Sequence, residues 1–125
     1  MSKRILVVED QEDNRRIVRD LLTSVGYELA EAVTGPEGVT MAETYRPDLI
    51  LMDIQLPGLD GYEVTRRIRA NPALRQVPII AVTSFALSGD DVKAFEAGCN
   101  GYVTKPYSPR QLLAKIREYL AEAVP

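Results

Sequence analysis

Residues 49–58 read LILMDIQLPG, so four apolar side chains run directly into the carboxylate of Asp53. A short apolar run that stops at turn residues, here Pro57 and Gly58, is typical of a strand buried on both faces of a sheet. Such strands occur in open parallel α/β sheets, whose ligands bind at the carboxyl ends of the strands. The stretch therefore predicts a central strand that presents Asp53 at a binding edge, and we interpret Asp53 as a nucleophile.

The rest of the chain repeats the pattern of a strand followed by a helix. Apolar runs at 5–8 and 79–82 indicate two more buried strands, whereas the weaker segments 28–32 and 101–104 indicate edge strands. Apolar spacing and capping signals predict a helix after each strand, over residues 13–25, 34–46, 62–70, 88–98 and 108–120. Five such repeats predict a doubly wound α/β fold, a five-stranded parallel sheet of order 2-1-3-4-5 with helices on both faces.

Two of the predicted helices begin with the spacing of a capping box, in which a hydroxyl residue is followed three positions later by Glu or Gln. These segments are 34–37, which reads TGPE, and 108–111, which reads SPRQ. Gly26 follows the first predicted helix and is suited to end it, because glycine readily adopts positive φ.

The composition indicates one soluble globular domain over residues 1–125. A hydrophobic fraction of 46% and a charged fraction of 26% are ordinary values, and a chain of 125 residues can bury a core without covalent staples. The net charge of −3 provides no basic field for nucleic acid, and no apolar run is long enough for a membrane span or a signal peptide. The single cysteine excludes a disulfide framework and favours the cytoplasm. The absence of histidine excludes a Ser-His-Asp triad and an internal phosphohistidine.

Polar side chains follow four of the predicted strands: Glu9, Asp10, Asp53, Thr83, Ser84 and Lys105. Because the carboxyl ends of parallel strands meet at one edge, we expect these side chains to face one another. Three gathered carboxylates would repel, and a Mg²⁺ ion, which takes oxygen ligands, would relieve that repulsion. The metal and the lysine would also neutralise a transferring phosphoryl group, while the threonine hydroxyl donates to it. The set predicts attack on phosphorus and an aspartyl phosphate.

Four blocks of the sequence resemble the receiver domain of two-component response regulators, the CheY-like family. They are Glu9-Asp10, Met52-Asp53, Val82-Thr83-Ser84 and Tyr102-Val103-Thr104-Lys105-Pro106. Their order and spacing match the family over essentially the whole chain. The resemblance implies a phosphoacceptor switch rather than an enzyme with a separate substrate. It also implies a histidine kinase or a histidine phosphotransfer protein as donor, a downstream protein target, and no direct contact with nucleic acid or membrane.

The resemblance further implies roles for individual residues. Asp53 accepts the phosphoryl group, and Thr83 and Lys105 contact its oxygens. Mg²⁺ is bound by Asp10, Asp53 and the backbone carbonyl of Gln55, with Glu9 acting through water. The acidic pair is Glu-Asp where Asp-Asp is commoner in the family, and this difference bears only on the fine geometry of the metal site.

The expected output is a change of surface. Tyr102 is the aromatic switch that turns inward after phosphorylation and alters the face formed by the fourth helix, fifth strand and fifth helix, roughly residues 91–120. The resemblance also implies a cis peptide between Lys105 and Pro106. Partner docking is expected at Asn14, Ile17 and Pro106. Gln55 and Phe85 flank the site, and we expect them to tune the lifetime of the phosphoryl group.

Other interpretations remain open at this point. Singly, an acid at a strand end is usually a solvated loop residue, and the functional interpretation depends on four strand ends converging. Phosphatases of the haloacid dehalogenase type carry Asp-x-Asp, but Asp53 is followed by Ile54 and Gln55. A flavodoxin-like carrier of FMN needs a Ser-, Thr- and Gly-rich loop where residues 9–13 are acidic. A receiver of this length is a free-standing regulator, a relay intermediate or a piece of a larger kinase.

Overall fold

The computed structural model describes residues 3–83 and 90–120, and it follows the predicted alternation of strands and helices. The strands are β1 (Arg4–Val8), β2 (Glu28–Ala32), β3 (Leu49–Asp53), β4 (Ile79–Thr83) and β5 (Gly101–Thr104). The helices are α1 (Glu12–Ser24), α2 (Gly35–Tyr45), α3 (Gly61–Arg69), α4 (Asp90–Ala97) and α5 (Pro109–Tyr119), with a 3-10 turn η1 at Pro72–Leu74. Within these described ranges, no helix has the length and apolar character needed to cross a membrane.

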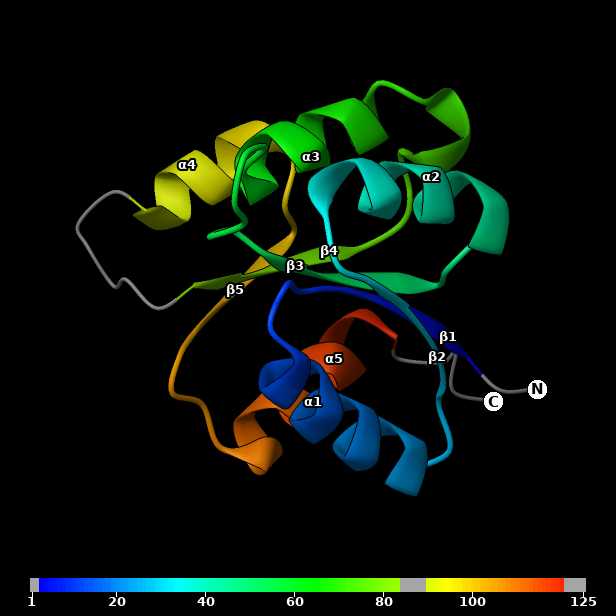
Figure 1. The fold of residues 1–125 in the computed structure, drawn as a ribbon, viewed down its shortest axis with the longest axis vertical. Coiled ribbons are helices and arrows are strands. Elements are labelled where there is room, and N and C mark those ends of the chain that lie inside the picture. Colours follow the sequence, from blue (N-terminus) through cyan, green and yellow to red (C-terminus); the bar gives the residue numbers. More distant parts are fainter. Residues whose placement is uncertain (1–2, 84–89, 121–125) are drawn as a thin grey trace.

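The five strands form one parallel sheet in the order β2-β1-β3-β4-β5, which confirms the predicted topology. Helices α2, α3 and α4 cover one face, and α1 and α5 cover the other (Figure 1). The three strands with continuous apolar runs are central, as their sequences predicted. The pairing of Val8 with Met52, of Asp53 with Val82 and of Thr83 with Thr104 brings these strand ends to one edge of the sheet.

The core consists of two clusters, one on each face of the sheet. Alternate residues of β1 and β3 enter different clusters: Leu6, Val8, Ile50 and Met52 face the α2–α4 side, and Ile5, Val7, Leu49 and Leu51 face the α1–α5 side. Because both faces are covered, every residue of β3 is buried. The two-residue period of a strand is therefore invisible in its sequence, and the run reads as continuously apolar.

The two predicted capping boxes have different outcomes. At α5 the box is complete, because Ser108 Oγ accepts from the Gln111 N–H at 3.1 Å and Gln111 Oε1 accepts from the Ser108 N–H at 2.9 Å. At α2 only half of it forms. Thr34 Oγ1 accepts from the Glu37 N–H, but the Glu37 carboxylate accepts from the N–H of Val33 at 2.7 Å, one residue earlier than expected. Gly26 adopts a φ of 94° after α1, as predicted.

Gly61 allows α3 to begin directly against the end of β3. A Cβ at this position would lie 2.7 Å from the Cα of Ile54 and closer still to the backbone oxygen of Asp53. The Gly61 N–H donates to the Ile54 carbonyl at 3.0 Å. The first residue of α3 is therefore part of the support of the strand end that carries Asp53.

We expect Gly61→Ala to destabilise the protein although alanine favours helices. The helix preference is worth about 1 kcal/mol. The clash is with backbone atoms, which cannot move aside cheaply, and overpacking of this kind costs about 1 to 3 kcal/mol. Chemical denaturation would measure the difference, with Arg66→Ala as control, because the Arg66 side chain on α3 is 56% exposed and its single ion pair contributes little. An increase in the free energy of unfolding would contradict this account of the close approach.

Candidate functional site

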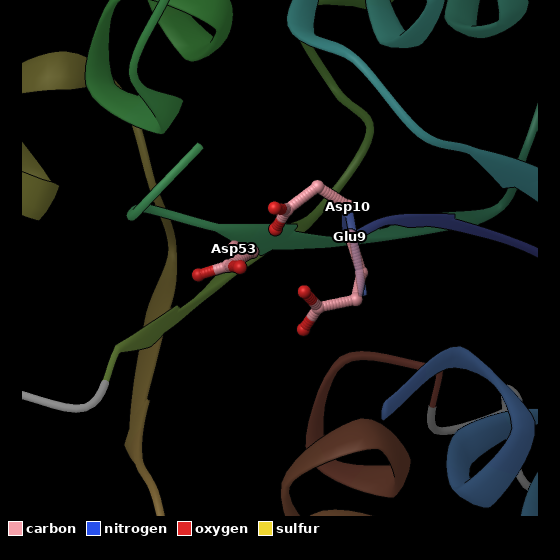
Figure 2. A group of neighbouring side chains, drawn as sticks. All are labelled: Glu9, Asp10 and Asp53. Atoms are coloured by element: carbon pink, nitrogen blue, oxygen red, sulfur yellow. The ribbon is translucent and has the colours of Figure 1, made fainter. Parts of the chain in front are cut away.

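Three carboxylates meet at the carboxyl edge of the sheet, as the sequence predicted. Glu9 and Asp10 follow β1 and Asp53 ends β3, and one oxygen from each lies within 4.8 Å of the others. Figure 2 shows the three side chains converging from these two neighbouring strands. Glu9 and Asp53 are each only 5% exposed, whereas Asp10 is half-buried. Negative charge is thus concentrated where water can screen little of it.

Lys105, which follows β5 at the same edge of the sheet, supplies the compensating positive charge. Its Nζ donates to Glu9 Oε1 at 2.9 Å and lies 3.8 Å from Asp53 Oδ2. The lysine side chain is 20% exposed, so this is a largely buried ion pair. The sequence placed Lys105 at this edge but did not reveal that its nearer partner is Glu9.

The backbone fixes the two buried acids in place. Asp53 Oδ1 accepts from the N–H of Gln55 at 3.0 Å, in the turn that follows β3. Glu9 Oε2 accepts from the N–H of Gln11 at 3.2 Å. With Oδ1 bonded to the backbone, Oδ2 is the oxygen of Asp53 that faces Lys105. The turn also places Gln55 beside Asp53, where its carbonyl was expected to contribute.

The donor set fits a magnesium ion. Mg²⁺ is a hard cation that takes oxygen ligands and is commonly held by one or two carboxylates with water and phosphate. Glu9, Asp10 and Asp53 offer only oxygen, and their three formal negative charges exceed the single charge of Lys105. Nitrogen and sulfur ligands of the kind that select zinc or copper do not belong to this group.

Thr83 ends β4 beside the carboxylates and is 2% exposed. Its carbonyl accepts from the Lys105 N–H at 2.6 Å, so the hydrogen bonding between β4 and β5 continues as far as Lys105. The peptide between Lys105 and Pro106 is cis, as expected.

Tyr102 on β5 is half-buried against the core cluster on the face that α2, α3 and α4 cover. Ser84 and Phe85 lie outside the described residues.

The three residues expected at a docking surface lie around one groove. Asn14, Ile17 and Pro106 line it together with Lys105 and Tyr107, and it encloses about 460 Å³. Ile17 is 59% exposed, which is unusual for an isoleucine on a helix that packs against a sheet. The structure therefore brings these residues together beside the carboxylates, and docking itself stays a prediction.

Tyr107 is a site residue that the sequence reasoning missed. It lines both the docking groove and a cavity of about 20 Å³ that also touches Glu9 and Asp53. Burial raises the pKa of its phenol, and the negative charges of these two carboxylates raise it further. The phenol is therefore neutral at ordinary pH. The sequence signal that could have identified Tyr107 is its position two residues after Lys105.

Comparison with known proteins gives one consistent family. The chain matches the response regulator receiver domain over residues 5–117. It is 43% identical to the polar-differentiation response regulator DivK of Brucella anthropi over 123 residues, which cover 98% of this chain and all of that one. The homologous protein of Brucella ovis is 42% identical over the same shares.

Solved structures agree with the sequence matches. The receiver domain of a sensor histidine kinase from Pseudomonas aeruginosa PAO1, with a magnesium ion in its active site cleft, superposes with a TM-score of 0.90. It is 40% identical, over 98% of this chain and 100% of that chain. A CheY-like receiver domain from Methanospirillum hungatei gives a TM-score of 0.88 at 34% identity, over 97% and 95% of the two chains. The chain belongs to the receiver domain family of response regulators, which are phosphoacceptor signalling domains.

Proposed function

We propose that this receiver takes a phosphoryl group from a phosphohistidine of a partner onto Asp53, with the help of Mg²⁺. The observation that carries the proposal is the burial of Asp53 among Glu9, Asp10 and Lys105, with one oxygen bonded to the backbone and the other beside the lysine. This is the arrangement that phosphoryl transfer requires, because positioning and charge neutralisation supply most of its catalysis.

In the proposed transfer, Asp53 Oδ2 forms the new bond to phosphorus as the bond from phosphorus to the partner's imidazole nitrogen breaks. The leaving imidazole keeps the electron pair of the broken bond. Asp10, Asp53 and the carbonyl of Gln55 would hold the metal, whose charge offsets that of the phosphoryl oxygens. Glu9 acts through water, since Lys105 occupies one of its oxygens.

After transfer, we propose that Lys105 and the Thr83 hydroxyl turn to the phosphoryl oxygens. Lys105 Nζ already lies 3.8 Å from Asp53 Oδ2, so a phosphoryl group on that oxygen would place its negative charge next to the lysine. Movement of Thr83 makes room for Tyr102, and the face of α4, β5 and α5 changes as a shift between two packings. Support comes from α4, where Val92 and Phe95 are 54% and 51% exposed and offer an apolar contact to a target.

The proposed partners are a histidine kinase or histidine phosphotransfer protein, which docks at Asn14, Ile17 and Pro106, and a downstream protein at the α4–β5–α5 face. Both would act in the cytoplasm. The groove supports the first assignment, because its lining includes Lys105, whose Nζ lies 3.8 Å from Asp53 Oδ2.

We expect a small phosphodonor to add one phosphoryl group to the wild type, in Mg²⁺ but not in EDTA. Asp53→Asn should add none, because an amide is a far weaker nucleophile. Intact-mass spectrometry would read both results. Asp60→Asn is the matched control, because Asp60 Oδ1 caps α3 by accepting from Glu63 and asparagine caps equally well. An adduct on Asp53→Asn, or one indifferent to EDTA, would refute the proposal.

We expect Lys105→Met to lower the stability of the metal-free protein and to increase the stabilisation that added Mg²⁺ provides. Without Mg²⁺, the variant leaves Glu9 and Asp53 without their cation, and the free energy of unfolding should fall by about 1 to 3 kcal/mol. Added Mg²⁺ should then raise the melting temperature more than in wild type, because the lysine no longer competes for Glu9. Thermal denaturation over a MgCl₂ series would measure both effects.

The control for that series is Lys115→Met. Lys115 Nζ lies 3.2 Å from Glu118 Oε2, and the Glu118 side chain is 58% exposed. It should change neither quantity appreciably, because exposed ion pairs contribute little. A smaller response to Mg²⁺ in Lys105→Met than in wild type would show that Lys105 supports metal binding rather than competing with it.

A further inference from the structure

The peptide that joins Glu9 to Asp10 is held from outside the site. The Glu9 N–H donates to the Ala32 carbonyl of β2 at 3.0 Å, as a continuation of the sheet. The Glu9 carbonyl accepts from Arg15 Nη1 of α1 at 3.0 Å. That carbonyl belongs to the peptide plane between the two acids, so its direction helps to set where both carboxylates lie.

Arg15 is itself fixed by charges that lie away from the site. Its side chain is 11% exposed, its Nε lies 3.3 Å from Glu31 Oε1 on β2, and it forms an ion pair with Glu12. Arg19 completes the set by donating to both oxygens of Glu31 at 2.7 and 2.8 Å. We name Glu12, Arg15, Arg19 and Glu31 the α1–β2 ionic cluster.

Arg15 differs in kind from the next arginine on the same helix. Arg16 pairs with Asp13 at 3.4 Å, and their side chains are 61% and 86% exposed. A pair so exposed contributes little to stability. Arg15 is largely buried, and its rigid planar guanidinium contacts a backbone carbonyl and two carboxylates, whereas a lysine would offer these acceptors a single point charge on a flexible stem.

We propose that Arg15 is a positioning residue for the magnesium site, acting through the Glu9 carbonyl and anchored by the α1–β2 ionic cluster. The inference rests on the proposed function, since it concerns the same metal site. Arg15 is not placed among the metal ligands and acts only on the peptide that carries two of the acids. Residues that orient metal ligands in this way commonly change metal affinity by 10- to 100-fold when replaced.

The test is the Mg²⁺ dissociation constant, measured by calorimetry, together with the free energy of unfolding in EDTA. Arg15→Met should weaken Mg²⁺ binding about tenfold. The Mg²⁺ dissociation constant of Arg15→Lys should lie between those of Arg15→Met and the wild type, because lysine keeps the charge but only part of the donor geometry. Arg16→Met is the matched control and should bind Mg²⁺ as the wild type does.

A merely structural role would move the free energy of unfolding and leave the Mg²⁺ dissociation constant at its wild-type value, and that result in Arg15→Met overturns the inference. If Arg15→Met does not fold, the double variant Glu12→Ala/Glu31→Ala decides, because it removes both carboxylates that pair with Arg15 without touching the site. Unchanged Mg²⁺ binding in that double variant would then overturn the inference. Failure of the wild type to bind Mg²⁺ would be a different result, since it removes the metal from the proposed function as well.

Discussion

The structure depends on one electrostatic constraint, the need to keep several carboxylates in a place that water screens poorly. Glu9 and Asp53 are buried side by side, and Lys105 lies between them as a cation supplied by the far end of the chain. Buried charges of like sign are tolerated only when they are paired and hydrogen-bonded. The backbone donors of Gln11 and Gln55 and the order of the parallel strands all serve to meet this requirement.

The same constraint explains why the site is held by its surroundings as well as by its own ion pair. A repelling set of acids has no tendency to assemble, so the fold must impose it. On one side β4 and β5 position Lys105, whose N–H donates to the Thr83 carbonyl, and on the other side α1 and β2 hold the Glu9 carbonyl through Arg15. The helix that carries Asn14 and Ile17 is thereby attached to the loop that carries two of the acids.

The sequence predicted the fold, and it predicted that Glu9, Asp10, Asp53 and Lys105 would meet at one edge of the sheet, because both follow from short local patterns. Continuous apolar runs identify β1, β3 and β4, and polar residues immediately after them must face one edge. It could not predict which atoms would pair. Arg15, Arg16 and Arg19 are alike in the sequence, and only the packing of α1 on β2 turns Arg15 toward the Glu9 carbonyl. Likewise, Glu37 reached Val33 and not Thr34, a difference of one residue that depends on the loop before α2.

Glu9 and Lys105, which form the buried pair, are separated by 96 positions in the chain. During synthesis the acids of β1 and β3 leave the ribosome well before the lysine that neutralises them. A nascent chain that ends before β5 lacks both this edge strand and Lys105. The carboxylates that follow β1 and end β3 would then repel one another without the lysine that neutralises them. The complete set of charges at this edge of the sheet therefore forms only when the last strand and the lysine that follows it are in place.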